Sequence, residues 1–191
     1  MSANPWSLLI PLLWIAWMLY WWIAARGAKA VRRRETPMSR ASYIAPLVIA
    51  VWLIAAGRVP IELLNRQIVP RNPGLFAAGA LLTAAGLAFT VWARRHLAGN
   101  WSATVTIKEN HTLVRDGPYR YVRHPIYTGI LLAFVGSALA RDEWRAVLGL
   151  AIAFFSFWRK LRLEERWLTE VFGEDYRRYC EEVRALIPFV L

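Results

Sequence analysis

The sequence predicts an all-α, polytopic membrane protein with about five transmembrane helices. Of its 191 residues, 57% are apolar and 11 are tryptophan. The apolar residues fall in long runs rather than at the spacing of an amphipathic helix or strand, which is typical of segments buried in a bilayer. The formal net charge is +11, and the basic residues concentrate between the apolar runs. This distribution favours a membrane surface, rather than nucleic acid, as the partner of the positive charge.

The first apolar run covers residues 6–25 and is about the length needed to cross a hydrocarbon core of roughly 30 Å. No Lys or Arg precedes it and a basic cluster follows it. This order of charges is the reverse of that in a secretory signal peptide, so we expect the segment to remain in the mature protein. The alternative is a buried helix in the core of a soluble protein. The tryptophans disfavour it, because they are spread over all faces of the helix.

The second apolar segment, residues 43–57, is short, and we expect it to tilt or to continue into an interfacial piece over 58–64. Two prolines and a glycine in the link 65–74 predict a loop. A third span follows over 75–93. Its two glycines would allow close helix packing within or between chains; they are Gly79 and Gly86.

The next segment, 94–125, is polar by the standards of this chain. Two apolar stretches follow it, at 126–140 and 146–158, and the short link between them predicts a tight helical hairpin. Residues 159–187 are expected to form a charged helical tail. Gly173 is the predicted stop of one helix, directly before the start of another.

The distribution of Lys and Arg predicts the orientation. The link 26–42 contains six, the segment 94–125 also six and the tail from 159 seven, whereas 58–73 contains three. The positive-inside rule therefore places the first link, the polar segment and the tail in the cytoplasm, with the N-terminus outside. The polar segment and the tail then share one compartment and can meet.

A string of aromatic and basic residues, GPYRYVRHPIYTG, covers positions 117–129. Pro125 disfavours the α conformation at His124 and suits the first turn of a helix. His124 and Arg123 are therefore expected at a helix N-terminus, where free N–H groups and the helix dipole favour an anion. Interfacial anchoring is the alternative, but it requires neither His-Pro nor two glycines. Aromatic faces and hydroxyls come from Tyr119, Tyr121 and Tyr127.

The tail contains two adjacent carboxylates, Glu164 and Glu165, directly after the last apolar stretch. On a helix they point about 100° apart. A solvated helical face with i,i+4 ion pairs is the alternative for most of the tail's charges. Glu164 and Glu165 lie nearest the membrane, where an unused charge is costly. The basic residues beside them are Arg159, Lys160 and Arg162.

Together, these stretches resemble the isoprenylcysteine carboxyl methyltransferase family and its relatives, the phospholipid N-methyltransferases. The shared pattern is a Gly-Pro-Tyr and Arg-His-Pro-x-Tyr-x-Gly block, then a hairpin, a Glu-Glu pair and a Phe-Gly-x-x-Tyr-x-x-Tyr block, here EERWLTEVFGEDYRRY. The upstream run NWSATVTIKENHTLVRDG is also similar. The resemblance covers about residues 95–190. It implies one membrane-embedded domain, 1–191, with three spans in 1–93 and the catalytic half in 94–191.

The resemblance implies a small integral membrane enzyme whose cofactor, S-adenosyl-L-methionine, lies in a cytosolic pocket between the motif segment and the C-terminal helices. Its lining would include His111, Leu113, Val114 and Tyr119. Arg123, His124 and Tyr127 would hold the polar parts of the cofactor. Glu164 or Glu165 would close the pocket. The candidate catalytic residues are Arg123, His124 and Glu164. Many relatives have Arg four residues before the first Glu, where this chain has Lys160.

The implied reaction is methyl transfer to a lipophilic acceptor, foremost the carboxylate of an isoprenylcysteine-like or other prenyl lipid, in the inner or plasma membrane of a prokaryote. An ionised carboxylate needs no general base but needs a basic residue to orient it. Phospholipid amines are the alternative acceptors, and they would need His124 or a Glu as base. The candidates for orienting the acceptor are Arg94, Arg95, Arg123, Arg159 and Arg162.

Two other classes remain open from the sequence. Membrane sterol reductases contain a similar Tyr-x-x-Arg-His-Pro-x-Tyr-x-Gly string, which would imply lipid reduction with NADPH, although the Glu-Glu pair favours methyl transfer. A non-enzymatic membrane scaffold is the last alternative. The sequence contains no Gly-rich phosphate loop, metal-ligand cluster or Ser-His-Asp ordering, and its single cysteine, Cys180, offers no metal site. We therefore expect neither a metal nor a nucleic-acid partner.

Overall fold

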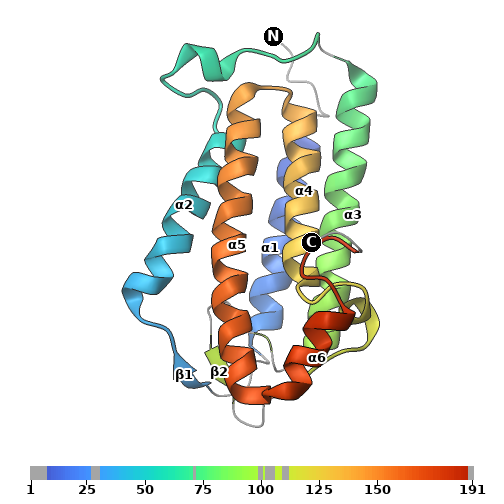
Figure 1. The fold of residues 1–191 in the computed structure, drawn as a ribbon. Coiled ribbons are helices and arrows are strands. Elements are labelled where there is room, and N and C mark those ends of the chain that lie inside the picture. The colour runs from blue at the N-terminus through green and yellow to red at the C-terminus, as the bar shows by residue number, and fades with distance from the viewer. Residues whose placement is uncertain are drawn as a thin grey trace.

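A computed structural model describes residues 8–26, 31–70, 72–98, 101, 106–108 and 112–188. Within these residues the fold is an upright bundle of five long helices with a short sixth helix at one end (Figure 1). The helices are α1 (Leu9–Ala25), α2 (Pro37–Ala55), α3 (Pro73–Leu97), α4 (Pro125–Arg141), α5 (Trp144–Phe172) and α6 (Glu174–Glu182), with 3-10 turns η2 (Glu62–Asn65) and η4 (Gly117–Arg120).

Each predicted apolar segment forms one of the five long helices. The tight hairpin is confirmed, because only Asp142 and Glu143 separate α4 from α5. The predicted stop is also confirmed, because Gly173 follows α5 with a φ of 54°. The segment 58–64 leaves the helix and leads into η2. The predicted helical class is thus confirmed, with one addition: β1 (Val31–Arg34) and β2 (Thr106–Lys108) pair as a short antiparallel sheet.

The order of the helices in space places α5 between α2 and α4, with α3 on the far side of α4 (Figure 1). Glycines let α3 and α4 approach closely. A Cβ on Gly86 would lie 2.5 Å from the carbonyl oxygen of Gly129, and one on Gly79 would lie 2.5 Å from that of Gly136. The close packing predicted for Gly79 and Gly86 is therefore realised within the chain.

Helix α1 packs on the α3–α4 pair through indole groups. The Trp14 Nε1 donates a hydrogen bond to Ser137 Oγ at 3.0 Å, and the Trp17 Nε1 donates to Thr90 Oγ1 at 2.6 Å. Two tryptophans of the first apolar run are thus internal contacts of the bundle. The outward face of the same helix remains apolar and exposed, as at Trp22.

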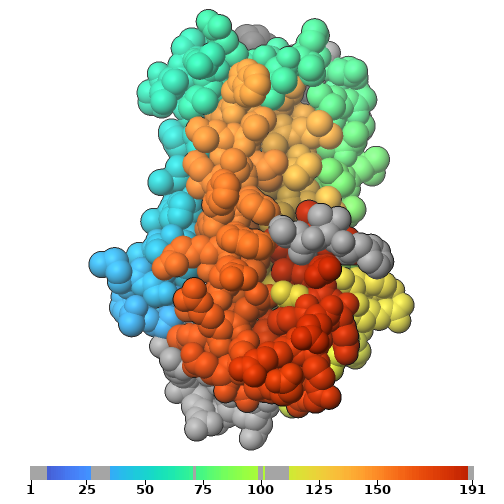
Figure 2. Space-filling view, in the orientation of Figure 1, coloured from blue at the N-terminus to red at the C-terminus, as the bar shows by residue number. Residues whose placement is uncertain are grey.

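The outer surfaces of α2, α3 and the first half of α5 are also apolar, and Figure 2 shows the face of the bundle that α2 and α5 form. Large exposed side chains include Val48 on α2, Leu81 on α3 and Phe155 on α5. Two helices, α2 and α3, are long and apolar enough to cross a membrane, whereas α1 and α4 are apolar helices of 17 residues each. A surface of this kind is unfavourable in water and suits a hydrocarbon surrounding.

Candidate functional site

The motif segment turns into α4 as the sequence predicts. Gly117 has a φ of 56° and opens η4, in which Pro118 and Tyr119 are buried. His124 is the N-cap residue of α4 and Pro125 occupies its first turn. The His124 side chain is buried. Proline and glycine therefore set the backbone that directs the imidazole into the molecule.

The C-terminal segment 183–188 covers the start of α4. The N–H of Arg123 donates to the carbonyl of Arg184 at 2.8 Å, and the N–H of His124 donates to that of Ala185 at 3.0 Å. The Thr128 hydroxyl donates to the Leu186 carbonyl at 2.7 Å. Two of the N–H groups that we expected to be free for an anion are therefore occupied by the chain itself.

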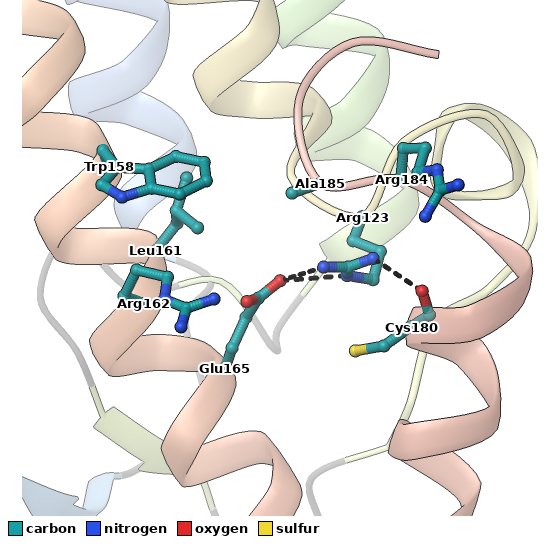
Figure 3. A pocket seen from close by; sticks show the side chains of 8 residues that line it. All are labelled: Arg123, Trp158, Leu161, Arg162, Glu165, Cys180, Arg184 and Ala185. Atoms are coloured by element: carbon teal, nitrogen blue, oxygen red, sulfur yellow. Dashed lines mark hydrogen bonds and ion pairs between the residues drawn. The ribbon is translucent and has the colours of Figure 1, made fainter. Parts of the chain in front are cut away.

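Arg123 is bound to Glu165 and to the end of α6. Its Nε lies 3.0 Å and its terminal nitrogen 2.6 Å from Glu165 Oε1. It also donates to the carbonyl of Cys180, at 3.1 Å (Figure 3), and to that of Val183. The same Glu165 oxygen lies 3.3 Å from His124 Nε2. Arg123 thus joins α5, α6 and the motif segment.

Glu164 faces a different group of residues. Its Oε1 accepts a hydrogen bond from the Tyr127 hydroxyl at 2.5 Å and lies 4.0 Å from Lys160 Nζ. Its Oε2 lies 3.7 Å from His124 Nδ1. The rings of His124 and Tyr127 stack with their centroids 5.5 Å apart. The imidazole therefore lies between the two carboxylates, each near one of its nitrogens.

The electrostatics of Glu165 follow from this geometry. Burial alone would raise the pKa of its carboxyl, but the hydrogen bonds and charges of His124 and Arg123 outweigh burial and lower the pKa to about 2. For Arg123, burial acts to lower the pKa of the guanidinium, yet the contact with Glu165 raises it overall. The two side chains therefore form an ion pair at neutral pH.

Helix α6 closes the other side of the site. The Tyr179 hydroxyl donates to the Tyr119 carbonyl at 2.5 Å. Burial raises the pKa of both phenols above the ordinary value, most strongly for Tyr119. Tyr179 belongs to the quoted Tyr-x-x-Tyr block, and that block is the sequence signal that could have identified it as part of the site.

Helix α2 contributes residues that the sequence reasoning missed. The Lys160 ammonium lies 5.1 Å from the ring centroid of Tyr127 and 5.5 Å from that of Tyr43. The Tyr43 hydroxyl donates to buried Glu35, and Ser39 Oγ donates to the same carboxylate at 2.9 Å. No motif marks these residues, so only the packing of α2 on α5 reveals them.

The remaining candidate residues have other partners or other degrees of burial. Arg94 is buried and donates to the carbonyls of Ala98 and Ala24, at 2.5 and 2.6 Å. Arg95 is exposed, and Arg159 donates to Ser42 Oγ at 2.6 Å. Leu113 and Val114 are half-buried in the segment before η4. His111 lies outside the described residues.

A pocket of about 250 Å³ lies on the Glu165 side of α5, facing α6 and the C-terminal segment (Figure 3). Arg162, the last of the acceptor-orienting candidates, lines it. The remaining lining residues are Arg123, Trp158, Leu161, Glu165, Cys180, Arg184 and Ala185.

No group of three or more His, Cys, Asp or Glu side chains suited to a metal occurs in the described part of the chain.

Comparison with known proteins adds a family match. The family described as phospholipid methyltransferase (PEMT) matches residues 75–175. Protein-S-isoprenylcysteine O-methyltransferase of Saccharomyces cerevisiae is 34% identical over 119 residues, 59% of this chain and 48% of the yeast protein. Protein-S-isoprenylcysteine O-methyltransferase A of Arabidopsis thaliana is 33% identical over 87 residues, 45% of this chain and 44% of the plant protein.

A bacterial protein with a different named acceptor also matches. Methanethiol S-methyltransferase 1 of Bradyrhizobium diazoefficiens is 37% identical over 71 residues, 37% of this chain and 24% of that protein. The chain spans less than half the length of each of these three relatives. The relatives thus share a methyltransferase name while their acceptors differ.

Proposed function

We propose, because the chain belongs to the phospholipid methyltransferase family, that it transfers a methyl group from S-adenosylmethionine to a lipophilic acceptor at a membrane surface. The observation that carries the proposal is the arrangement of two carboxylates around one imidazole. His124 Nε2 lies 3.3 Å from Glu165, and His124 Nδ1 lies 3.7 Å from Glu164. The relatives named above as methyltransferases support it.

The residues of this cluster fit the polar groups of the cofactor. Glu164 is the more exposed carboxylate, at 22% against 12% for Glu165, and it would take the ammonium group. Tyr119 is the aromatic residue proposed to lie near the sulfonium, because the Tyr127 ring is already stacked on His124 and Phe157. When bound, the cofactor supplies an electrophilic methyl group, whose bond to sulfur breaks as the bond to the acceptor forms. The protein's part is to position the reactants and exclude water.

Arg123 and Glu165 have a different role in this proposal. Each is already neutralised by the other, and Arg123 also donates to two carbonyls of the C-terminal region. We assign them to positioning His124 rather than to contact with the reacting atoms. His124, Tyr127 and Glu164 are the proposed cofactor-binding residues, together with Leu113, Val114 and Tyr119. His111 stays a prediction from the sequence, because it lies outside the described residues.

The acceptor that we favour is a lipid carboxylate, as in the relatives named isoprenylcysteine O-methyltransferases. A carboxylate is ionised at neutral pH and requires no proton removal. Glu165, whose pKa is lowered to about 2, is a poor base, so an amine acceptor would depend on His124 or Glu164. Lys160, held between Tyr43 and Tyr127 and 4.0 Å from Glu164, is the basic residue that we assign to orienting the acceptor.

A phospholipid amine is the second candidate, because the matched family takes its description from phospholipid methylation. The pH dependence of methylation distinguishes the two. Carboxylate methylation should be flat between about pH 6 and 9, whereas amine methylation should rise because the amine must lose a proton. A steep rise with pH would exclude the carboxylate.

We further infer that α1 to α5 all cross the membrane as one domain, residues 1–191, with three spans in the first half and the site in the second. The apolar outward faces support this, and the charge counts favour a cytoplasmic site and tail, with the start of α1 outside. Accessibility of Cys180 to a membrane-impermeant thiol reagent tests the orientation. It should react only when the cytoplasmic face is open to the reagent.

The direct test of the proposed function is calorimetry on the detergent-purified protein with S-adenosylmethionine and its demethylated product, and with NADPH for comparison. Micromolar binding of both adenosyl compounds that is lost in His124→Ala and Glu164→Ala would establish the cofactor. Binding of NADPH alone would indicate a reductase. Folded protein that binds none of these compounds would indicate a scaffold.

A further inference from the structure

The pocket in Figure 3 lies on a separate face of α5 from the residues proposed to bind the cofactor. Trp158, Leu161, Arg162 and Glu165 follow one another at helical spacing and line it. Glu164, one residue before Glu165, is rotated by about 100° and does not line the pocket. The pocket therefore lies beside the residues of the proposed methyl-transfer site, on the Glu165 side of α5.

The charges in this pocket are unbalanced. It is lined by three arginines and one glutamate, and that glutamate is already bound to Arg123 and His124. Arg162 and Arg184 are exposed at its rim, and no carboxylate of the described residues forms an ion pair with either. The lining therefore carries an excess of positive charge, which favours a phosphate or carboxylate ligand.

The rest of the lining is apolar, and it lies where the apolar stretch of α5 gives way to charged residues. Leu161 and Ala185 are buried and form a wall, and Trp158 is half-buried beside Arg162. Trp158 is also the last residue of the apolar stretch 146–158, after which the charged part of α5 begins. Tryptophan and arginine at such a position are typical of the headgroup region of a bilayer.

We propose that this pocket binds the phosphate headgroup of an anionic membrane lipid. Arg162 and Arg184 would hold the phosphate from α5 and from the C-terminal segment, and Trp158 would contact the glycerol and upper acyl chain. Basic clusters at a cytoplasmic membrane surface attract such lipids. The inference goes beyond methyl transfer, because the ligand is neither cofactor nor acceptor.

Lipid binding here would also act on the neighbouring site. Arg184 and Ala185 supply the carbonyls that receive the N–H groups of Arg123 and His124. A lipid that bridges Arg162 and Arg184 would hold the C-terminal segment against α5 and thereby fix His124 in place. We therefore expect anionic lipid to stabilise the position of His124.

The single cysteine of the chain provides the measurement, because Cys180 lines this pocket and is half-buried. The protein is reconstituted in nanodiscs of phosphatidylcholine, with or without phosphatidylglycerol, and the rate of Cys180 modification by a maleimide is followed. Lipid at about ten times its dissociation constant should slow the reaction about tenfold. Arg162→Gln/Arg184→Gln should remove this protection.

The matched control is Arg177→Gln/Arg178→Gln, which removes the same charge from the exposed face of α6, where the arginines pair with Glu174 and Asp175. It should retain the protection. Equal loss in both variants would overturn the proposal in favour of general surface charge, as would unchanged labelling on addition of phosphatidylglycerol. The single variants Arg162→Gln and Arg184→Gln, each expected to weaken protection, replace the double variant if it does not fold.

Two further ligands test the source of the anion in phosphatidylcholine nanodiscs. Protection by inorganic phosphate equal to that by phosphatidylglycerol would overturn the assignment to a lipid. Protection by an N-acylated farnesylcysteine, but not by phosphatidylglycerol, would make the pocket an entrance for the acceptor and also overturn it. Protection by phosphatidylglycerol alone supports the proposal.

Discussion

Arg123 and Arg145 lie near opposite ends of the α4–α5 pair and make similar contacts. Arg123 binds Glu165 and the carbonyls of Cys180 and Val183. Arg145 binds Glu143 at 2.5 Å and the carbonyls of Leu53, Ala56 and Gly57 at 2.9, 2.6 and 3.3 Å. Each arginine therefore attaches a distant backbone segment to α5, the C-terminal segment at one end and the end of α2 at the other.

The surroundings of the two arginines differ. The Arg145 side chain is fully buried, and its glutamate makes one more ion pair within the described residues, with Arg141 at 3.8 Å. The Arg123 side chain is 10% exposed, borders a pocket and shares its glutamate with His124. The same arginine chemistry is thus architectural at one end and part of a candidate site at the other. What differs is that the glutamate partner of Arg123 also contacts a histidine, and that Arg123 borders a pocket.

The largest expected effect on stability is that of Arg145→Met. It would leave the carbonyls of Leu53 and Gly57 without this donor, whereas the carbonyl of Ala56 keeps Arg141, and Glu143 would lose its closest partner. Breaking a buried ion pair of this kind costs about 3–5 kcal/mol. The midpoint of thermal unfolding in detergent, followed by tryptophan fluorescence, measures it. Arg95→Met at an exposed position should stay within about 0.5 kcal/mol of the wild type, and equal midpoints for the two variants would contradict this account.

The second prediction concerns Arg123→Met. We expect a smaller loss of about 1–3 kcal/mol in stability, because Glu165 keeps His124 as a partner. Affinity for S-adenosylmethionine should fall at least about tenfold, since the C-terminal segment is released from the motif. Calorimetry on the folded fraction should show the opposite for Arg145→Met, with binding retained. Loss of binding in both variants would mean that the two ends are not separable.

Local signals in the sequence account for the parts of the fold that were predicted. Long apolar runs gave the helices, His124-Pro125 the start of α4, and Gly173 the end of α5. The roles of Glu164 and Glu165 came from the resemblance to a family rather than from helical geometry, which indicated only that they diverge. These features depend on residues close together in the chain.

The parts that were missed depend on distant contacts. Arg145 was treated as part of a short link because nothing near it in sequence indicates that the end of α2 will lie against it. Tyr43 contacts the site only because α2 packs on α5. The pairing of Val122 with Arg184 likewise joins segments that no local pattern connects. Tertiary packing, not local propensity, determines all three.

The third prediction uses the pKa of Glu165. Since this pKa is lowered to about 2 from an ordinary 4.5, the ionised group stabilises the fold fully above about pH 4.5 and loses this contribution as the pH falls toward 2. Glu165→Gln should therefore be less stable at pH 7 and lose less stability across that window. Unfolding midpoints from pH 7 to 2.5 measure this, with exposed Glu181→Gln as control. Parallel pH profiles for Glu165→Gln and wild type would exclude the charged pair.

The smallest effect is expected for Glu143→Gln, at about 1 kcal/mol. Arg145 would keep its three carbonyl acceptors, and the amide oxygen of Gln can still accept a hydrogen bond. Binding of S-adenosylmethionine should be unchanged, whereas Glu165→Gln should weaken it because His124 loses a charged partner. If Glu143→Gln proves as destabilising as Arg145→Met, the ion pair rather than the capping of α2 holds that end together, and the two arginines would then work in the same way.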